Sequence, residues 1–402
     1  MSVTYPRGFR AAGVTAGFKP SGQPDLALLV GDPGTTAVGL FTTNRVAAAP
    51  VGLSRARLST SAPRAVLVNS GQANAATGAR GDADAAAATD AAAAALALVP
   101  EEMLHCSTGV IGEPLHIEQL LDVLPKLVAA LGADGGDDFA RAIMTTDSVE
   151  KVAAVDACDF RVGGCAKGVG MIAPNLATML AFVTTDAPVS EHDLQRLADE
   201  QLKPRFNALT VDDCTSTNDT VLLFASGVAA GADVASGSVA PGSSEWTDLS
   251  GGVAAVGESL VRQLIADGEG ANHVLLIEVG GAGSEADARV VAKAVAGSAL
   301  VKTAAFGCDP NPGRIQQAIG SSGVGVDPGR IDVSIGDVRL ATRGVIPPAY
   351  FEDPSTAEAA RGQMTGPEIH IAISLGDGPG SSRAFGCDLS YDYVRINGEY
   401  TT

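Results

Sequence analysis

The stretch of sequence that decides the fold is KGVGMIAPNLATMLAFVTTD, which covers residues 167–186. Its first half is rich in glycine and broken by a proline, a composition that is typical of loops. Its second half is apolar, and the run over 178–183 predicts a buried β-strand. Thr178 therefore stands where a loop enters the first position of a strand.

Thr178 has two interpretations at this junction. Its role can be purely structural, because a β-branched side chain fits the pleated surface at the start of a strand. Alternatively, its hydroxyl is a nucleophile, and the α-amine released by cutting the preceding bond serves as the base. Because a free α-amine has a pKa of about 8, part of it is neutral near pH 7. The local pattern leaves both interpretations open.

The composition of the chain limits the classes of protein to which it can belong. Of its 402 residues, 46% are hydrophobic but only 4% aromatic, so it can bury two or three packed subdomains with aliphatic cores. A net charge of −19 disfavours nucleic acid as a partner, since phosphate binding requires a basic patch. The charge does not exclude a small acidic substrate, which needs only one or two local cations.

The cysteines and histidines argue against disulfides and metals. The cysteines form no Cys-x-x-Cys pair, and we expect all of them to be small buried side chains in a reducing compartment. They are Cys106, Cys158, Cys165, Cys214, Cys308 and Cys387. The histidines are far apart, so no metal site is expected. With no signal-peptide core and no apolar run of about 18 residues, we expect a cytoplasmic protein without a membrane partner.

Apolar periodicity predicts an α/β or α+β fold. Strands are expected at 26–30, 36–41, 65–69, 178–183, 219–225, 273–279, 331–335 and 368–375. Helices are expected at 82–98, 115–131, 191–203, 253–266 and 285–297. Ser190 and Asp193 form a capping arrangement before the third of these helices. The stretch 226–252, rich in Gly, Ser and Ala, predicts an exposed connection.

One glycine-rich turn matches a dinucleotide-binding fingerprint. The apolar run 274–279 leads into GAGSEA at 281–286, which fits G-x-G-x-x-A and precedes a predicted helix. No further βαβ unit follows, and no clear acidic residue stands about 20 positions on to bind a ribose. We therefore favour a tight strand-to-helix turn over a nucleotide site.

A second short motif suits acyl-transfer chemistry. Transfer of an acyl group through a threonine requires an activated hydroxyl, a site for the oxyanion and a group that holds the substrate. The segment CSTGVIG at 106–112 offers a hydroxyl and a glycine N–H that can point at one oxygen. The alternative is an ordinary turn from a strand into a loop.

Several further segments carry a family resemblance. They are RAVLVNSGQANAATG at 64–78, AIMTTD at 142–147, TSTNDT at 215–220, DGEG at 267–270, LVKTAAFGCDPNPGR at 300–314 and RINGEYTT at 395–402. Together with 106–112 and 167–186, they resemble the ornithine acetyltransferase family, the glutamate N-acetyltransferases of arginine biosynthesis. Gln72 stands where that family usually has Asn, and Pro312 where it usually has Trp. These departures leave the choice of substrate more open than the type of reaction.

The resemblance implies a chain that cuts itself between Ala177 and Thr178. The products are an α-chain, residues 1–177, and a β-chain, residues 178–402, which associate as a heterotetramer of two α- and two β-chains. The implied fold is a layered α/β sandwich that resembles the N-terminal-nucleophile hydrolases but differs in connectivity. Residues 178–280 complete the catalytic core, and residues 281–402 form a C-terminal α/β subdomain.

The resemblance also assigns roles in the site. Thr178 is the nucleophile, while Thr108 and Gly109 hold the oxyanion. Substrate contacts are assigned to Thr145, Lys167, Thr178, Glu269, Asn397 and Thr402. The residue types agree, since a lysine ammonium suits a substrate carboxylate and a glutamate suits a substrate ammonium. Lys167 as a surface lysine and Glu269 as a helix-end carboxylate are the alternatives, and no cofactor or metal is implied.

The implied reaction moves acetyl from N2-acetyl-L-ornithine to L-glutamate through an acetyl-threonine, with ping-pong kinetics. Three alternatives stay open. The enzyme can also accept acetyl-CoA as a donor, or it can be a self-cleaving aminopeptidase or amidase in which water is the acceptor. The third is a non-catalytic dinucleotide-binding or scaffold protein in which Thr178 is structural.

Overall fold

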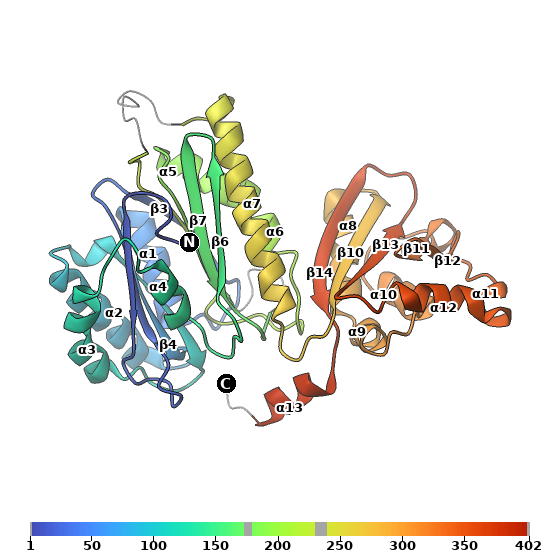
Figure 1. Ribbon diagram of the computed structural model, residues 1–402, viewed down its shortest axis with the longest axis horizontal. Coiled ribbons are helices and arrows are strands. Elements are labelled where there is room, and N and C mark those ends of the chain that lie inside the picture. The colour runs from blue at the N-terminus through green and yellow to red at the C-terminus, as the bar shows by residue number, and fades with distance from the viewer. Residues whose placement is uncertain (1, 173–178, 230–238, 400–402) are drawn as a thin grey trace.

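The computed structural model describes residues 2–172, 179–229 and 239–399, and within them it has three β-sheets flanked by helices (Figure 1). In the first sheet the strand order is β1 (Phe9–Val14), β2 (Leu26–Gly31), β4 (Ala65–Gln72) and β5 (Met103–Val110). In the second it is β3 (Thr36–Phe41), β9 (Thr220–Ala225), β8 (Leu180–Thr185), β7 (Phe160–Lys167) and β6 (Lys151–Ala157). The mixed α/β class predicted from the sequence is confirmed.

The first two sheets pack face to face and bury an apolar core between them. Leu29, Val68 and Leu104 of the first sheet belong to the same cluster as Phe182 and Leu222 of the second. Helices α4 (Gly136–Ala142) and α1 (Ala49–Thr60) close the two open edges of this sandwich, by contacts to β1 and β6 and to β5 and β3. Helices α2 (Gly78–Ala95) and α3 (Ile117–Ala129) cover the outer face of the first sheet.

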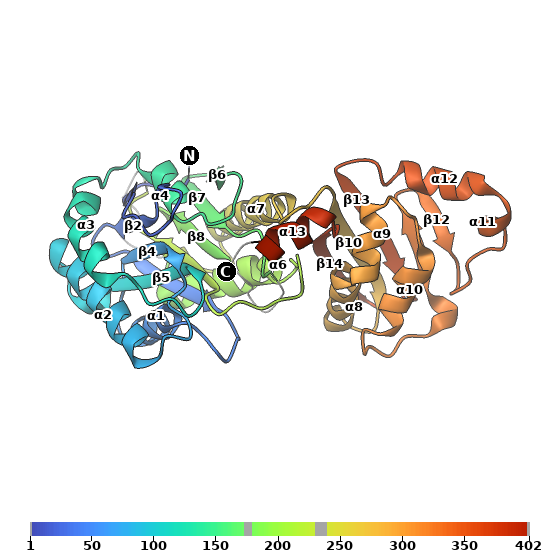
Figure 2. The same cartoon turned by 90° about the horizontal axis from the view of Figure 1, so that it is seen from below.

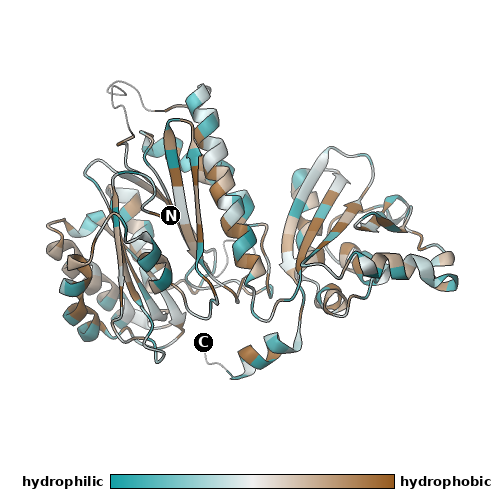
Figure 3. Ribbon diagram, viewed as in Figure 1, coloured by the Kyte–Doolittle hydropathy of each residue, from teal (hydrophilic) through white to brown (hydrophobic). Residues whose placement is uncertain are grey.

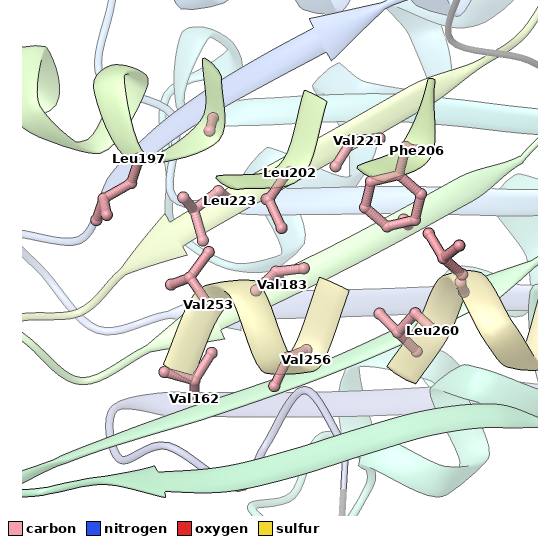
Figure 4. Packing of buried hydrophobic residues seen from close by; sticks show 14 of the residues in the cluster. Val162, Val183, Leu197, Leu202, Phe206, Val221, Leu223, Val253, Val256 and Leu260 are labelled. Carbon is pink, nitrogen blue, oxygen red and sulfur yellow. The ribbon is translucent and has the colours of Figure 1, made fainter. Parts of the chain in front are cut away.

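The outer face of the second sheet is covered by α5 (Glu191–Leu197), α6 (Lys203–Phe206) and α7 (Ser244–Ala266). Figure 4 shows Val253, Val256 and Leu260 of α7 projecting toward Val183 and Leu223 of the strands. The predicted exposed connection over 226–252 is wrong in its last third, because α7 begins there. The Ser243 hydroxyl caps this helix by accepting the Trp246 N–H at 3.0 Å, and buried Trp246 and Leu249 extend its apolar face.

The other predicted elements agree with the structure to within a few residues, but one predicted helix is interrupted. The helix predicted over 191–203 is α5, a π-helical turn (Ala198–Leu202) and α6, and the Ser190 hydroxyl accepts the Asp193 N–H at 3.2 Å as expected. The strand predicted over 178–183 is β8, which begins at Leu180. In the first two sheets, β1, β5, β6 and β7 were not predicted, and in the third sheet the strands over 338–341 and 380–387 were not predicted either. Strand β7 carries two glycines, which weaken the β-strand pattern.

The third sheet forms a separate unit beside the sandwich (Figures 1 and 2). Its strand order is β12 (Val338–Ala341), β11 (Asp332–Ile335), β13 (Glu368–Ser374), β10 (Val274–Ala282) and β14 (Gly380–Cys387). Its helices are α8 (Glu285–Gly297), α9 (Ala299–Phe306), α10 (Pro312–Gly320), α11 (Ala349–Glu352) and α12 (Pro354–Gly362). Short 3-10 helices lie at Pro100–Glu102 and Pro328–Arg330. The third sheet begins at Val274, several residues before the subdomain boundary expected at 280/281.

The fingerprint-like turn of this unit packs closely against the protein's own backbone. Gly281 has a φ of +72°, and a Cβ there would lie 2.1 Å from the Gly376 carbonyl oxygen. The Ser284 hydroxyl accepts the Asp287 N–H at 3.1 Å and so caps α8. The glycines therefore serve a tight strand-to-helix turn, as favoured from the sequence.

Helix α13 (Tyr391–Glu399) follows the third sheet and runs back beneath the molecule toward the sandwich (Figures 1 and 2). Figure 3 shows apolar bands along the strands and mixed bands along α7. All six cysteines are free, but the expectation that all are buried is wrong, because Cys158 and Cys214 are exposed and Cys308 is only partly buried. No helix in the described ranges combines the length and apolar character needed to span a bilayer.

Candidate active site

A polar pocket lies where β5 and β7 end, beside the segment that leads into β9. It encloses about 620 Å³ of empty space up to its open mouth. Segments far apart in the sequence line it: Ala73, Thr108, Gly109, Ile111, Thr145, Thr146, Lys167, Val169, Gly170, Met171, Ser216, Thr217, Asn218, Glu269 and Asn397. All but Asn397 come from the sandwich and the segment after α7, and Asn397 is brought in by α13.

Lys167, the last residue of β7, is the cation of this pocket and is only 3% exposed. Its Nζ lies 3.0 Å from Thr108 Oγ1 and 2.8 Å from Thr145 Oγ1. An ammonium only donates hydrogen bonds, so both hydroxyl oxygens act as acceptors and their own protons point elsewhere. Burial lowers the pKa of Lys167, and the nearby Asp147 carboxylate opposes that shift.

Thr108 and Gly109 lie at the end of β5, directly before the strand finishes at Val110. Gly109 pairs with Gly71 of β4 and has a φ of +131°. A Cβ at Gly109 would lie 2.2 Å from the Gly71 carbonyl, so no larger residue fits without displacing β4. The segment is thus a strand-to-loop turn, and it also brings a hydroxyl and a glycine backbone into the pocket.

Glu269 supplies the carboxylate of the pocket and is 9% exposed. Its Oε1 accepts the Thr146 hydroxyl at 3.1 Å, and its Oε2 accepts the Asn397 amide at 2.8 Å. Gly170 lies against it, since a Cβ there would be 2.3 Å from Oε2. Among the described residues, the pocket therefore holds one buried cation and one hydrogen-bonded anion, the charges that complement an amino-acid zwitterion.

The structure brings together six of the predicted site residues: Thr108, Gly109, Thr145, Lys167, Glu269 and Asn397. Three others, Ala177, Thr178 and Thr402, lie outside the described residues. Within the described ranges, no group of His, Cys, Asp or Glu side chains is arranged to hold a metal ion.

Sequence reasoning assigned no role to several residues that the structure places here. Thr146 and the segment 216–218 line the pocket, and Asn218 Nδ2 donates to the Ala73 and Ser107 carbonyls at 2.6 and 2.8 Å, which ties the two sheets together. The signal was present in the polar run TSTNDT directly before an apolar strand, but the pattern does not say which side chain points inward.

Asp219 is the most unusual of these residues because it is fully buried. One carboxyl oxygen accepts the Met179 N–H at 3.0 Å, and that nitrogen is bonded to the residue predicted as nucleophile. Among the described residues, the other oxygen has no hydrogen-bond partner of normal geometry, although the Thr42 and Ser216 hydroxyls are close. Burial raises the pKa of Asp219 well above its ordinary value.

The two departures from the family pattern fall at different distances from the pocket. Gln72 ends β4, one residue before the pocket-lining Ala73, and its buried Oε1 has no hydrogen-bond partner. Pro312 is the first residue of α10 in the third-sheet unit, where Asn311 caps the helix by accepting the Arg314 N–H at 3.1 Å. Pro312 does not line the pocket.

Fold and site together define a mixed α/β protein with an ionic pocket between two packed sheets and the C-terminal helix. The chain belongs to the ArgJ family, whose model matches residues 10–402. It is 44% identical over 411 residues to the arginine biosynthesis bifunctional protein ArgJ of Synechocystis sp., covering 100% of this chain and 98% of that protein.

The same name belongs to a Thermus thermophilus relative that is 44% identical over 403 residues, covering 100% of both chains. Among solved structures, ornithine acetyltransferase complexed with ornithine, from Mycobacterium tuberculosis, is 48% identical. That match covers 44% of this chain and 96% of the other, with a TM-score of 0.43.

Proposed function

We propose that this chain is a glutamate N-acetyltransferase that moves acetyl from N2-acetyl-L-ornithine to L-glutamate in arginine biosynthesis. Full-length relatives named for arginine biosynthesis support this assignment. The observation that carries it is the contact of the buried Lys167 ammonium with the Thr108 and Thr145 hydroxyls, in the pocket that also holds Glu269. This arrangement suits an acyl-transfer site for a charged amino acid.

The nucleophile in this proposal is Thr178, freed by self-cleavage of the Ala177–Thr178 bond. The threonine hydroxyl attacks the Ala177 carbonyl, and the peptide C–N bond breaks as the ester forms, which releases the Thr178 α-amine. Water then hydrolyses the ester, which frees the Thr178 hydroxyl and leaves Ala177 with a carboxylate. The products, residues 1–177 and 178–402, stay associated, and two copies of each form a heterotetramer in the cytoplasm. The sandwich contains strands from both products, so cleavage leaves the core between the sheets intact.

In the first half-reaction, the Thr178 Oγ attacks the acetyl carbonyl of acetylornithine. The C–O bond forms, the amide C–N bond breaks, and the hydroxyl proton passes through the α-amine to the departing ornithine nitrogen. Thr108 donates to the developing oxyanion, because its oxygen already accepts from Lys167 and its proton is free to turn toward the substrate. The Gly109 N–H is the second donor.

In the second half-reaction, the glutamate amine attacks the acetyl-threonine ester. The ester C–O bond breaks, and the proton lost by the amine returns to the Thr178 oxygen. Lys167 pairs with a substrate carboxylate in both half-reactions, as its charge requires. Glu269 pairs with the side-chain ammonium of acetylornithine in the first half-reaction, whereas the glutamate amine attacks in its neutral form. Thr145, Asn397 and Thr402 complete the substrate contacts, and no cofactor enters either step.

Acetyl-CoA is a second candidate donor. The word "bifunctional" in the names of the relatives favours a second activity. An acetyl-threonine made from acetyl-CoA would enter the same second half-reaction, so one site serves both donors.

The deciding experiment compares acceptors and donors with purified protein. Acetylornithine plus glutamate should give acetylglutamate and ornithine, and acetylornithine alone should add one acetyl group to the peptide that begins at Thr178. Release of acetate at the same rate with or without glutamate would instead identify an amidase. Acetylglutamate formed from acetyl-CoA would establish the second donor, and absence of both products would reject the assignment.

A further inference from the structure

A cluster of buried charges lies directly behind the pocket. Lys151, the first residue of β6, has no solvent-exposed surface. Its Nζ lies 2.6 Å from Asp147 Oδ1 and 2.5 Å from Asp267 Oδ2. Fully buried lysines are rare, and buried ion pairs seldom exceed well-packed apolar groups in stabilising a fold. The cluster therefore requires an explanation other than stability.

The first arm of the cluster runs through Asp147 to the cationic side of the pocket. Asp147 Oδ2 accepts the Thr145 N–H at 3.0 Å, and Oδ1 accepts the Gly168 N–H at 2.7 Å. Thr145 is one partner of the Lys167–Thr145 contact, and Gly168 directly follows the other partner, Lys167, in the chain. A shift of the Asp147 carboxylate would move both ends of that contact.

The second arm runs through Asp267 to the anionic side. Asp267 follows the last residue of α7, accepts the Ser148 N–H at 3.0 Å, and also accepts the Ser148 hydroxyl. Two residues later, Glu269 donates its N–H to the Val169 carbonyl at 2.8 Å. One ammonium thus joins the segments that carry Thr145, Lys167 and Glu269.

We propose that Lys151 is a positioning residue that fixes the spacing between the Lys167 and Glu269 sides of the pocket. It contacts no pocket space itself and acts through Asp147 and Asp267. The inference rests on the proposed function, because the spacing is the one that matches the carboxylate and the ammonium of the amino-acid substrates. Removing the ammonium should loosen both arms together and weaken substrate binding.

The charges around Asp147 also predict how the activity of the enzyme should depend on pH. Burial alone would raise the pKa of Asp147, but Lys167, Lys151 and the Gly168 N–H bring it below its ordinary value. Lys19 also faces it, while Asp267 and Glu269 are the nearby anions. A depressed pKa means that the ionised form, which holds Thr145 and Gly168, persists in wild-type enzyme until the pH falls well into the acid range. Without Lys151, Asp147 should take up its proton at higher pH.

The test compares Lys151→Met with Asp186→Asn in the acetylornithine–glutamate assay. Asp186 is equally buried but lies at the far end of β8, where it accepts the Arg161 N–H at 2.8 Å. For Lys151→Met we expect kcat/KM to fall roughly 10- to 100-fold, mostly through KM, as is typical when substrate is misplaced. The acid limb of its pH profile should rise by about one unit or more, as loss of a neighbouring charge predicts. Asp186→Asn should lose thermal stability without either kinetic change.

Both variants are first checked for cleavage by intact mass. A folded, cleaved Lys151→Met enzyme with wild-type KM and pH profile would overturn the inference, as would equal kinetic changes in Asp186→Asn. If Lys151→Met does not fold, Asp267→Asn removes one arm at a less buried position; a raised KM supports the inference, and an unchanged KM overturns it. Wild-type protein without acetyl transfer rejects the proposed function instead.

Discussion

The sandwich and the third-sheet unit are both α/β structures, yet they differ in where they bury charge. The fully or nearly fully buried ionic side chains of the sandwich and its pocket are Asp25, Lys151, Lys167, Asp186, Asp219 and Glu269. The core of the third-sheet unit consists of residues such as Ile277, Ile335 and Ile371. Its ion pairs Arg330–Asp377 and Arg339–Asp332 are exposed and contribute little to stability. The third-sheet unit also buries two charged side chains, Lys302 and Asp388, but neither of them lines the pocket. Buried charge within the pocket, at Lys167 and Glu269, therefore distinguishes the sandwich and the segment after α7 from the third-sheet unit.

Among the described residues, the part of the third-sheet unit that lines the pocket is its C-terminal extension. Asp388 anchors the start of that extension by accepting the Asn272 and His273 N–H groups at 2.7 and 2.9 Å. The Ser390 hydroxyl then donates to the Gly270 carbonyl at 2.6 Å, directly after Glu269. From there α13 carries Asn397 to Glu269. Among the described residues, the C-terminal extension thus contributes one side chain, Asn397, to the lining of the pocket.

The largest effect should come from replacing Thr178, which stands two residues before the start of β8 in the sequence. Thr178→Ala removes the hydroxyl required for both self-cleavage and acyl transfer. We expect one uncut chain by intact mass and acetyl transfer at background level. Thr178→Ser keeps the hydroxyl and is the matched control, which should still cleave. An uncut Thr178→Ala protein with full activity would refute the mechanism.

The next largest effect should fall on Thr108, at the oxyanion position. Thr108→Val keeps the shape but removes the donor, and loss of one such donor typically lowers kcat roughly 10²- to 10³-fold. KM should change little, because the interaction strengthens only in the transition state. Steady-state kinetics on cleaved protein measures both constants, and a near-normal kcat would assign the oxyanion to other donors.

Lys167→Met separates binding from chemistry less cleanly than Thr108→Val. Loss of the ammonium should raise KM, because the substrate carboxylate loses its partner. It should also lower kcat, since Lys167 Nζ lies 3.0 Å from Thr108 Oγ1 and orients that hydroxyl. A double-mutant cycle with Thr108→Val measures this coupling. Strictly additive effects on kcat would show that Lys167 does not act through Thr108.

A smaller effect should follow when the contact from the third-sheet unit is removed. Asn397→Ala deletes the amide that lies 2.8 Å from Glu269 Oε2. A hydrogen bond to a charged group contributes about 1.5–3 kcal/mol, so KM should rise roughly tenfold or more while cleavage stays complete. An unchanged KM for both substrates would show that α13 is dispensable for binding.

The sequence predicts some residues of the site and misses others. Thr108, Lys167 and Glu269 were predicted because they lie in distinctive motifs, and all three line the same pocket. Lys151 and Asp219 were missed because single charged residues next to apolar runs look like surface residues. Only tertiary packing shows that Lys151 is buried between Asp147 and Asp267.

The fold was predicted best where one face of an element is uniformly apolar. Helix α8 was predicted at its observed ends, whereas the first turns of α7 were missed because Gly, Ser and Ala precede it. Strands β6 and β7 escaped prediction because glycines and alanines dilute their alternating pattern. Sheet order was beyond the sequence, since β3 pairs with β9, which is distant in the chain.

The smallest predicted effect isolates stability in the third-sheet unit from chemistry in the sandwich. Asn311 caps α10 by accepting the Arg314 N–H at 3.1 Å, and its helix does not line the pocket. Replacing such a cap by alanine costs about 1 kcal/mol, so Asn311→Ala should lower the free energy of unfolding of this unit by that amount. Because α10 contributes no side chain to the pocket, KM and kcat for both substrates should stay at wild-type values, in contrast to Asn397→Ala. Chemical denaturation and steady-state kinetics on the same preparation measure the two quantities. A raised KM in Asn311→Ala, with cleavage complete, would mean that the position of α13 depends on the packing of the whole third-sheet unit, and the two regions would then have to be treated as one functional body.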